Sequence, residues 1–338
     1  MPLPQATLAR HGVLLLVGVV LVLLILQFTG DFQNYQFAQL SFFVIAAAGL
    51  TVLTGLNGQI SLGHGALMAV GAYTTALLMT KGGLGATLSF VIAVIVTAAV
   101  GTLVGAAAAR LTGPYLAGAT LALAVGLPGL ATKFKGAFGG EQGLNVGVSA
   151  PNSFGESFPL TRWQAYIGWT AALLTVFVLA NLVRSRYGRA FRAVRDDQVA
   201  AELAGIHVAR TQVLAFVVSS ACAGLAGAVY AVVITLVAPT GFTLVLSLGL
   251  LTAIVLGGLG SLLGVLWGSL LLVFLPQFST DLAAKLHLSS AVGANIPPAF
   301  YGVVLVVVML VAPAGIQGTV AKVRLARTNR ALASGSKA

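Results

Sequence analysis

The sequence is poor in charged residues. Only 7% of its 338 residues are Asp, Glu, Lys or Arg, whereas soluble globular domains carry about 25%. Hydrophobic residues make up 58% and the mean hydropathy is +1.01, so we expect an integral membrane protein. A net charge of +11 would suggest nucleic acid for a soluble chain. Here the cations gather in two short stretches and suit a membrane surface with anionic lipids, so we expect lipid partners and no nucleic acid.

Reactive residues are equally scarce. The single cysteine, Cys222, excludes an internal disulfide and a cysteine-based cluster, and no metal site is expected. No G-x-x-x-x-G-K-[ST] sequence occurs, so the chain has no evident means of hydrolysing ATP itself. It also lacks a paired set of acids, a histidine cluster and a G-x-S-x-G elbow, which argues against an enzyme and against any catalytic residue.

Acidic residues bear on a second alternative, a secondary transporter driven by an ion gradient. Such a transporter needs Asp or Glu inside its spans. The sequence has 7 acids; Asp31, Glu141, Glu156 and Asp281 fall in predicted loops, and the others fall in one basic segment. This placement disfavours the alternative without removing it.

Long hydrophobic runs define the fold. A membrane-spanning helix needs about 20 mainly apolar residues. The candidate segments are 12–28, 38–54, 62–80, 86–109, 115–131, 161–183, 212–236, 243–259, 261–278 and 297–312. The first is long for a signal peptide and no A-x-A site follows it, so we expect it to be retained. Because 115–131 or 243–259 could be re-entrant, we predict an all-α polytopic membrane protein of about 8–10 transmembrane helices with Gly-rich broken or re-entrant segments.

The remaining regions predict the domain organisation. We expect one transmembrane domain over residues 1–338, with a polar extramembrane loop at 134–162 and a second connection at 279–298. The basic segment 184–211 and the basic tail 316–338 are predicted to be cytoplasmic, because short cytoplasmic loops carry the excess of Lys and Arg. If all candidate segments span, these two regions and the N-terminus share one side. Lys133 and Lys135 then lie outside.

The basic segment also has a helical composition, and Gly205 is placed to end the helix. Its small residues and Asp197 would form one face, flanked by charges: Ala190, Ala193, Asp197, Ala201 and Ala204 on the face, with Arg189, Arg192, Arg195, Asp196 and Glu202 beside it. One interpretation is a short helix inserted in a groove of a cytoplasmic partner. The other is a charged interfacial loop held by lipid headgroups.

A glycine-rich motif follows the second hydrophobic run. Between Gly55 and Gly65, glycines alternate with polar residues at membrane depth. Polar side chains and irregular backbone are tolerated there when they face a cavity or the protein interior. We therefore predict a broken helix that lines a solute path. The alternative is that these small and polar residues hold neighbouring helices together. The candidate path residues are Asn57, Gly58, Gln59, Ser61, Gly63 and His64.

Three weaker signals complete the pattern. Glu141 and Gln142 lie in a glycine-rich loop that could meet a docking protein, gate a solute or simply be solvated. The ridges at 101–105 and 260–268 have glycine at every fourth position, and we favour packing within the chain over a dimer interface. Segments 54–73 and 256–271 are loosely alike, as in transporters with internal repeats.

Several motifs in order resemble a known family. They are GLNGQISLGHGALMAVGAY, the GGEQGL loop, YGRAFRAVRDDQVAAELAGIHVARTQVLAF, PTGFTLVLSLGLLTAIVLGGLGSLLGVLWG and YGVVLVVVMLVAPAGIQG. From about residue 38 to 318 the chain resembles the permease subunit of branched-chain amino acid ABC importers, of the type often called LivM. The resemblance implies a multi-pass protein of the bacterial inner (plasma) membrane. It also implies alternating access, driven by partner subunits that bind ATP and Mg.

The resemblance further implies the partners and the coupling residues. The partners would be a second homologous permease subunit, two ATPase subunits and a periplasmic or lipid-anchored solute-binding protein. Ala200, Ala201 and Gly205 match the E-A-A-x-x-x-G coupling pattern, although Val199 replaces its Glu and its apolar-Pro ending is absent. The full set expected to couple to the ATPases is Arg192, Asp196, Asp197, Ala200, Ala201, Glu202 and Gly205. Related importers carry urea or short-chain amides, so the substrate stays open.

Overall fold

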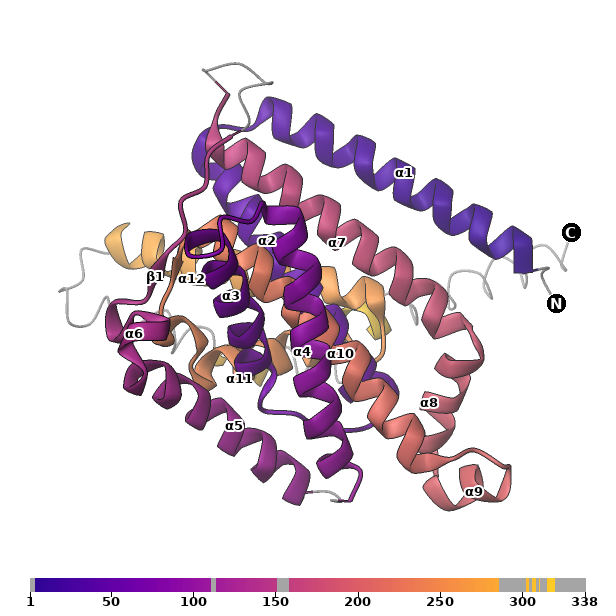
Figure 1. The fold of residues 1–338 in the computed structure, drawn as a ribbon. Helices are drawn as coiled ribbons and strands as arrows, with labels where there is room; N and C mark the ends of the chain where they lie inside the picture. Colours follow the sequence, from indigo (N-terminus) through magenta and orange to yellow (C-terminus); the bar gives the residue numbers. More distant parts are fainter. Residues whose placement is uncertain are drawn as a thin grey trace, which may run out of the picture.

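The computed structural model describes residues 4–110, 114–150, 158–285, 302–303, 306–307, 310 and 315–319 (Figure 1). The helices are α1 (Pro4–Phe28), α2 (Asp31–Leu50), η1 (Thr51–Leu56), α3 (His64–Thr80), α4 (Ala86–Ala108), α5 (Pro114–Lys133), α6 (Lys135–Phe138), η2 (Gly140–Gln142), α7 (Leu160–Arg184), α8 (Arg186–Asp196), α9 (Gln198–Leu203), α10 (Val208–Ile234), η4 (Pro239–Phe242), α11 (Leu244–Gly257) and α12 (Leu262–Lys285). Two short strands, β1 (Leu144–Asn145) and β2 (Leu236–Val237), pair antiparallel.

The helices confirm a polytopic membrane fold. Within the described residues, 7 helices are long and apolar enough to cross a bilayer. α3, with 17 residues, and the apolar part of α12, Leu262–Phe278, are shorter. The last candidate segment, 297–312, lies mostly outside the described residues, as does the basic tail beyond residue 319.

Two predicted connections are more ordered than the sequence indicated. α12 continues to Lys285, so Asp281 lies in a helix rather than in the predicted loop. The described part of the polar loop 134–162 folds into α6, η2 and β1, and β1 pairs with the strand that follows α10. Backbone hydrogen bonds between the two strands therefore tether this loop to the bundle.

Contacts between the helix ends identify the two ends of the bundle. His11 Nδ1 on α1 lies 2.9 Å from Asn181 Oδ1 on α7, which places the start of α1 beside the end of α7 and the basic segment. β1 lies at the far end of α10, and the chain reaches it through Lys133 and Lys135. Figure 1 shows this separation, with α8 and α9 near the N-terminus and α6 at the opposite end. Which end of the bundle faces the cytoplasm stays a prediction.

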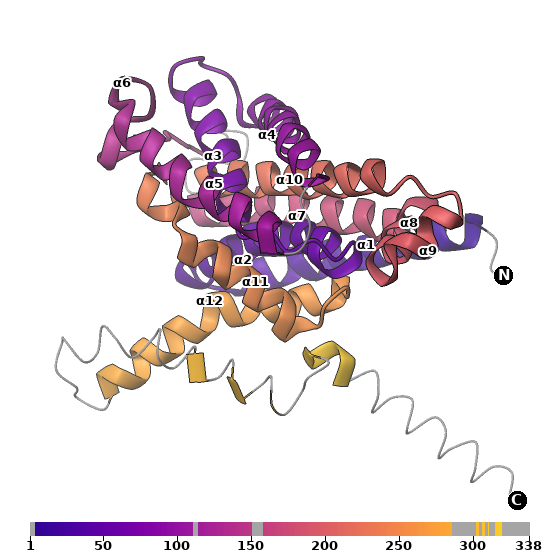
Figure 2. The same cartoon turned by 90° about the horizontal axis from the view of Figure 1, so that it is seen from below.

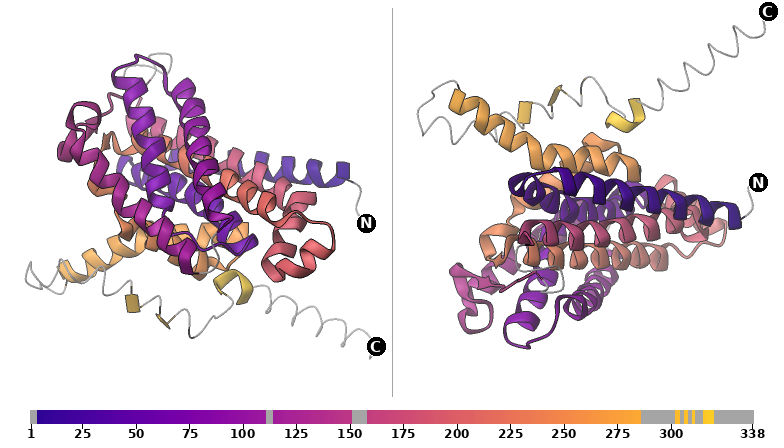
Figure 3. Two further views of the ribbon diagram at one scale, coloured as in Figure 1. Left: turned by 60° about the horizontal axis from the view of Figure 1, so that its bottom comes forward. Right: turned by 90° about the horizontal axis from the view of Figure 1, so that it is seen from above.

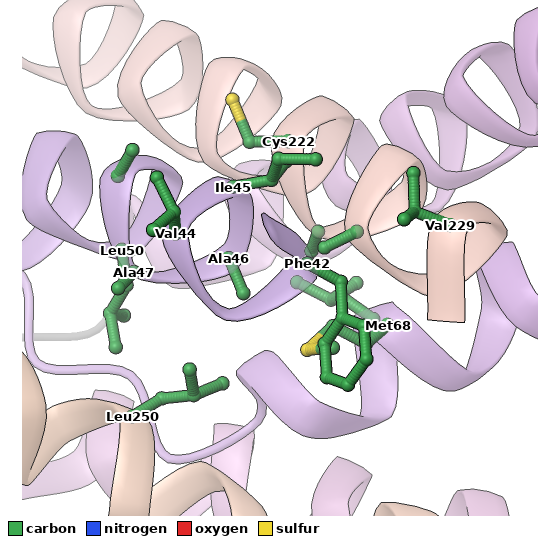
Figure 4. Packing of buried hydrophobic residues seen from close by; sticks show 14 of the residues in the cluster. Phe42, Val44, Ile45, Ala46, Ala47, Leu50, Met68, Cys222, Val229 and Leu250 are labelled. Atoms are coloured by element: carbon green, nitrogen blue, oxygen red, sulfur yellow. The ribbon is translucent and has the colours of Figure 1, made fainter. Parts of the chain in front are cut away.

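α10 lies at the centre of the bundle and packs against α4, α3 and α2. Its small residues allow this, because a side chain on Gly227 would collide with the Met68 carbonyl of α3. Phe42 and Ile45 on α2 pack beside Cys222 and Val229 on α10 (Figure 4). In a bilayer, such close packing of small residues is what holds helices together.

The glycine ridges pack within the chain, as favoured from the sequence. Gly105 on α4 faces Phe216 of α10, where an added Cβ would lie 2.8 Å from the Phe216 Cβ. Gly264 and Gly268 on α12 face backbone atoms of Gly257 and Ala253 on α11. Both ridges therefore serve helix packing inside one subunit.

The flanks of the bundle are apolar and exposed. α1 packs mainly on α7, and its outward residues include Leu16, which is 64% exposed. Figure 2 shows α12 on one side of the bundle with α3 and α4 on the other, and in the right view of Figure 3 α1 runs along the outside beside α7. Such surfaces match lipid chains or the apolar face of a neighbouring subunit.

Candidate coupling segment and translocation path

The basic segment folds as two helices, not as the single helix that the sequence predicted. α8 ends at Asp196, and Asp197 is extended, with φ −159° and ψ 114°. The Asp197 carboxylate accepts hydrogen bonds from the amides of Val199 and Ala200 at 2.9 and 3.0 Å. This is an N-cap, which favours starting a new helix over continuing the old one. Asp197 therefore shapes the segment and does not belong to a continuous small face.

The end of α9 agrees with the prediction for Gly205. Gly205 has φ +81°, and the Ile206 amide reaches back to the Ala201 carbonyl at 2.9 Å. A left-handed glycine just past the last turn is a common helix ending. Open space surrounds the position where a Cβ would stand, so the glycine is required by the backbone and not by a neighbour.

α9 presents an apolar surface outward. Leu203 is 86% exposed and Val199 is 68% exposed, while Ala201 on the other side is only 3% exposed and packs with Val194 and Val208. Of the predicted coupling residues, Ala200 and Glu202 lie on the exposed side. Val199 and Leu203 stand near the matched alanines but were not among the predicted coupling residues.

The other predicted coupling residues lie on α8. Arg192 is half-buried and its Nη2 donates to the Val183 carbonyl of α7 at 3.3 Å, which anchors the segment to the bundle. Asp196 is exposed and forms an ion pair with Arg195, with 2.8 Å between Nη2 and Oδ1. Both residues thus serve the shape of the segment in the isolated subunit.

The glycine-rich motif breaks the helix, as predicted. α2 continues into η1, a π-helical stretch, whose end is marked by the Asn57 amide bonding the Val52 carbonyl five residues back at 3.2 Å. Residues 57–63, called here the first break, then lead to α3 without regular structure. π-helical turns inside helices are frequent at functional sites.

Most polar groups of the first break bond to the protein. Gln59 Nε2 donates to the Gln212 carbonyl of α10 at 3.2 Å, and His64 Nε2 lies 2.9 Å from the Ala46 carbonyl. The amides of Gly63 and Gly65 donate to the hydroxyls of Ser61 and Ser247 at 3.4 and 3.0 Å. These hydroxyl oxygens therefore already accept hydrogen bonds from amides at the start of α3. Such amides could otherwise bind an anionic group.

Asn57 and His64 retain unused polar atoms. Asn57 is buried, and its side-chain oxygen and nitrogen have no hydrogen-bond partner among the described residues; the same is true of His64 Nδ1. Gly58 lies against Arg195, and Gly63 lies against Thr120 of α5. Five of the six predicted path residues are thus buried between α8, α10, α11 and α5, whereas Gly58 is exposed.

Two apolar hollows among the described residues lie along α5. One of about 410 Å³ lies between α4 and α5, and another of about 430 Å³ lies between α3, α5 and α6. Thr120, which accepts a hydrogen bond from the Leu62 amide of the first break at 3.0 Å, is the one polar residue that lines the hollow between α4 and α5. The six predicted path residues do not line these two hollows. Their role in a path stays a prediction.

A second interruption meets the first. Residues 258–261, called here the second break, separate α11 from α12 and contain Gly258 and Gly260, both with positive φ. A Cβ on Gly55 would lie 2.5 Å from the Gly260 nitrogen, so the end of η1 and the second break touch through backbone atoms. The similarity between segments 54–73 and 256–271 thus corresponds to two interrupted helices in contact.

Arg195 connects these interruptions to the basic segment. Its Nη1 donates to the Gly55 carbonyl at 2.8 Å, across 140 positions of sequence. From the sequence, Arg195 was predicted only to be a charge flanking the small face. No local pattern indicated this contact, because it depends on how α8 packs against η1.

The predicted docking or gate residues lie at the opposite end. Glu141 and Gln142 form η2 and are exposed. Glycines with positive φ surround them, and Gly143 packs against the Val237 carbonyl of β2. The loop is therefore held against the end of α10 while its two polar side chains remain free to meet solvent or another protein.

These features place the chain in the class of multi-pass helical membrane proteins with interrupted helices, an architecture that transporters use. The chain matches the family described as branched-chain amino acid transport system / permease component over residues 35–313, and it belongs to that family.

The chain is also similar to individual permease proteins of branched-chain amino acid transport systems. The chain is 33% identical over 262 residues to the high-affinity branched-chain amino acid transport system permease protein LivM of Escherichia coli, covering 71% of this chain but only 61% of LivM. It is 28% identical to LivH of E. coli, covering 82% of this chain and 92% of LivH. BraD of Pseudomonas aeruginosa is 28% identical over 71% of this chain and 83% of BraD. No solved structure gives a significant match.

Proposed function

We propose that this chain is the transmembrane permease subunit of an ABC importer for branched-chain or related apolar amino acids. It would form the translocation path with a second permease subunit in the bacterial inner membrane. Two ATPase subunits, which bind ATP and Mg, would drive it from the cytoplasm, and a solute-binding protein would deliver the substrate outside. Family membership and the names of the relatives support this proposal.

The observation that carries the proposal is the exposed apolar surface of α9. Val199 and Leu203 project from a segment that is otherwise rich in arginine and that lies outside the spans. Exposed apolar side chains on a short ordered helix are typical of a helix that enters a groove on a partner. Arg192 anchors the segment to α7, and the N-cap Asp197 fixes the start of α9. A displacement of α9 by a partner would therefore be transmitted to the helix bundle.

The ion-driven alternative has less support. Intramembrane carboxylates that carry coupling ions are buried in the spans of such transporters. Of the acidic side chains whose exposure the structure describes, including Asp31 and Glu141, each is exposed. The chain itself is expected to have no catalytic role, because ATP hydrolysis would belong to the partner subunits.

The substrate within the family needs its own test. The hollows beside α5 are apolar, which suits aliphatic side chains better than urea. However, the binding protein would set most of the selectivity. We expect leucine, isoleucine and valine to compete for uptake and urea or acetamide not to compete. The reverse pattern would assign the chain to the amide branch.

The first experiment is purification of the tagged chain from its native membrane in mild detergent, with mass spectrometry of the proteins recovered. A second glycine-rich permease and Walker-motif ATPases should accompany it, and the complex in liposomes should take up leucine only with ATP and the binding protein. Recovery of this chain alone, active with an ion gradient, would establish the secondary-transport alternative instead.

A further inference from the structure

One side chain joins the segment that faces the proposed ATPases to the interrupted helices. Arg195, in the last turn of α8, donates from Nη1 to the Gly55 carbonyl at 2.8 Å. Its Nη2 and Nε donate to Asp196 Oδ1 at 2.8 and 3.0 Å. A Cβ added to Gly58 would stand 2.8 Å from Arg195 Cγ, so the arginine stem lies directly on the first break. Both the stem and the guanidinium thus contact the end of the interrupted helix.

The Gly55 carbonyl is a position where a cation is favoured. The backbone bonds that close the end of η1 use the carbonyls of Val52, Leu53 and Thr54. Gly55 comes next, in the last turn, where helical carbonyls lack partners and carry the negative end of the helix dipole. A guanidinium satisfies such a carbonyl with a charge-assisted hydrogen bond, which is stronger than a neutral one.

The contact continues beyond Gly55. Gly55 and Gly260 meet through their backbones, so no flexible side chain separates the end of η1 from the second break. On the other side, α8 is held by Phe191 and Val194, which are both buried. Arg195 is thus a side chain of α8 that contacts the first break at Gly58 and also the end of η1, which touches the second break.

Asp196 sets the direction of the guanidinium. It binds two of the Arg195 nitrogens, which leaves Nη1 pointed at Gly55. The ion pair is solvent-accessible, with side-chain exposures of 37% and 64%, so its own contribution to stability is small. Its effect is geometric, because the planar fork of arginine keeps three donors in fixed relative directions.

We propose that Arg195 is a positioning residue that carries displacement of the α8–α9 segment to the two interrupted helices. The inference rests on the proposed function, since it assigns to Arg195 the transmission step between ATPase closure and the opening of the path. Without this contact, α8 could move while residues 57–63 and 258–261 stay in place. ATP hydrolysis would then continue with little transport.

The first measurement is hydrogen exchange of the purified chain in detergent, which needs no assumption about transport. Arg195→Met keeps the length of the stem but removes its donors. It should speed amide exchange in residues 57–63 severalfold, while Arg189→Met, a matched exposed arginine on α8, should leave these residues as in the unmodified chain. Unchanged exchange in Arg195→Met would overturn the structural link, whatever the chain transports.

The second measurement is the ratio of substrate imported to ATP hydrolysed by the complete importer in liposomes. Arg195→Met should retain ATPase activity within about twofold and lose on the order of tenfold in uptake, the size of a typical coupling between two sites. Arg195→Lys keeps the positive charge but presents its donors from one nitrogen, without the planar fork, and should recover part of the ratio. Arg189→Met should keep the ratio of the unmodified importer.

The outcomes distinguish the positioning role of Arg195 from the proposed function of the chain. A normal ratio in Arg195→Met overturns the positioning role, and so does a parallel loss of ATPase activity and uptake, which would indicate a direct contact with the ATPase. If Arg195→Met does not assemble, Arg195→Lys decides: a lowered ratio supports the role and a normal ratio overturns it. Absence of ATP-driven uptake in the unmodified complex would refute the proposed function, while the exchange result would still stand for the link.

Discussion

Replacing Gly205 tests whether the shape of α9 matters for transport. Gly205 has φ +81°, and a Cβ there would meet no neighbouring atom within 4 Å. A substitution therefore adds backbone strain and no collision. For an ordinary L-residue the left-handed conformation costs about 1–2 kcal/mol, and for asparagine it costs less. Because 1.4 kcal/mol corresponds to a factor of ten, this strain favours another ending of α9 by about 5- to 30-fold.

We expect Gly205→Val to lower uptake by on the order of tenfold and Gly205→Asn to remain close to the unmodified protein. The assay is ATP-dependent leucine uptake, normalised to the amount of chain in the membrane by immunoblot. If the valine variant takes up leucine as fast as the unmodified protein, the ending of α9 is unimportant for transport. An equal loss in both variants would show that the added side chain obstructs a partner, and would refute the argument from backbone strain.

Three further substitutions test other parts of the subunit. Ala201→Arg places a charge at a position 3% exposed against Val194, so α9 should detach and uptake should be abolished with the chain still in the membrane; retained uptake would contradict this. Asp197→Ala removes the N-cap and should weaken α9 by about 1 kcal/mol, seen as faster amide exchange in 198–203 but not in α10. Gly227→Ala inserts a methyl against the Met68 carbonyl and should cost about 1–3 kcal/mol, seen as a lower unfolding temperature in detergent than for Gly126→Ala, where the space is open.

The sequence predicts the spans of this fold well, because hydrophobic runs of membrane length have few alternatives. The predicted segments 86–109 and 161–183 match α4 and α7 within one residue at each end. The broken helix after Leu56 was also predictable, since glycines and polar residues at membrane depth cannot continue a lipid-facing helix.

Other features depended on tertiary contacts. Asp197 is compatible with a helix interior and with an N-cap, and only the packing of Val194 and Ala201 in one cluster decides between them. The contact of Arg195 with Gly55 joins residues far apart in sequence and leaves no periodic trace. β1 and β2 have two residues each, too few for a strand pattern to be recognised.

α10 has a mechanical consequence for the two ends of the subunit. Its 27 residues form one uninterrupted helix from the basic segment to β2, a rod about 40 Å long. A rod of that length amplifies rotation: tilting it by about 5° about one end displaces the other end by roughly 3.5 Å. Since β2 is bonded to β1, such a tilt would shift the loop bearing Glu141 by a comparable amount. A displacement of α10 at the end beside α9 would therefore be felt at the loop that bears Glu141.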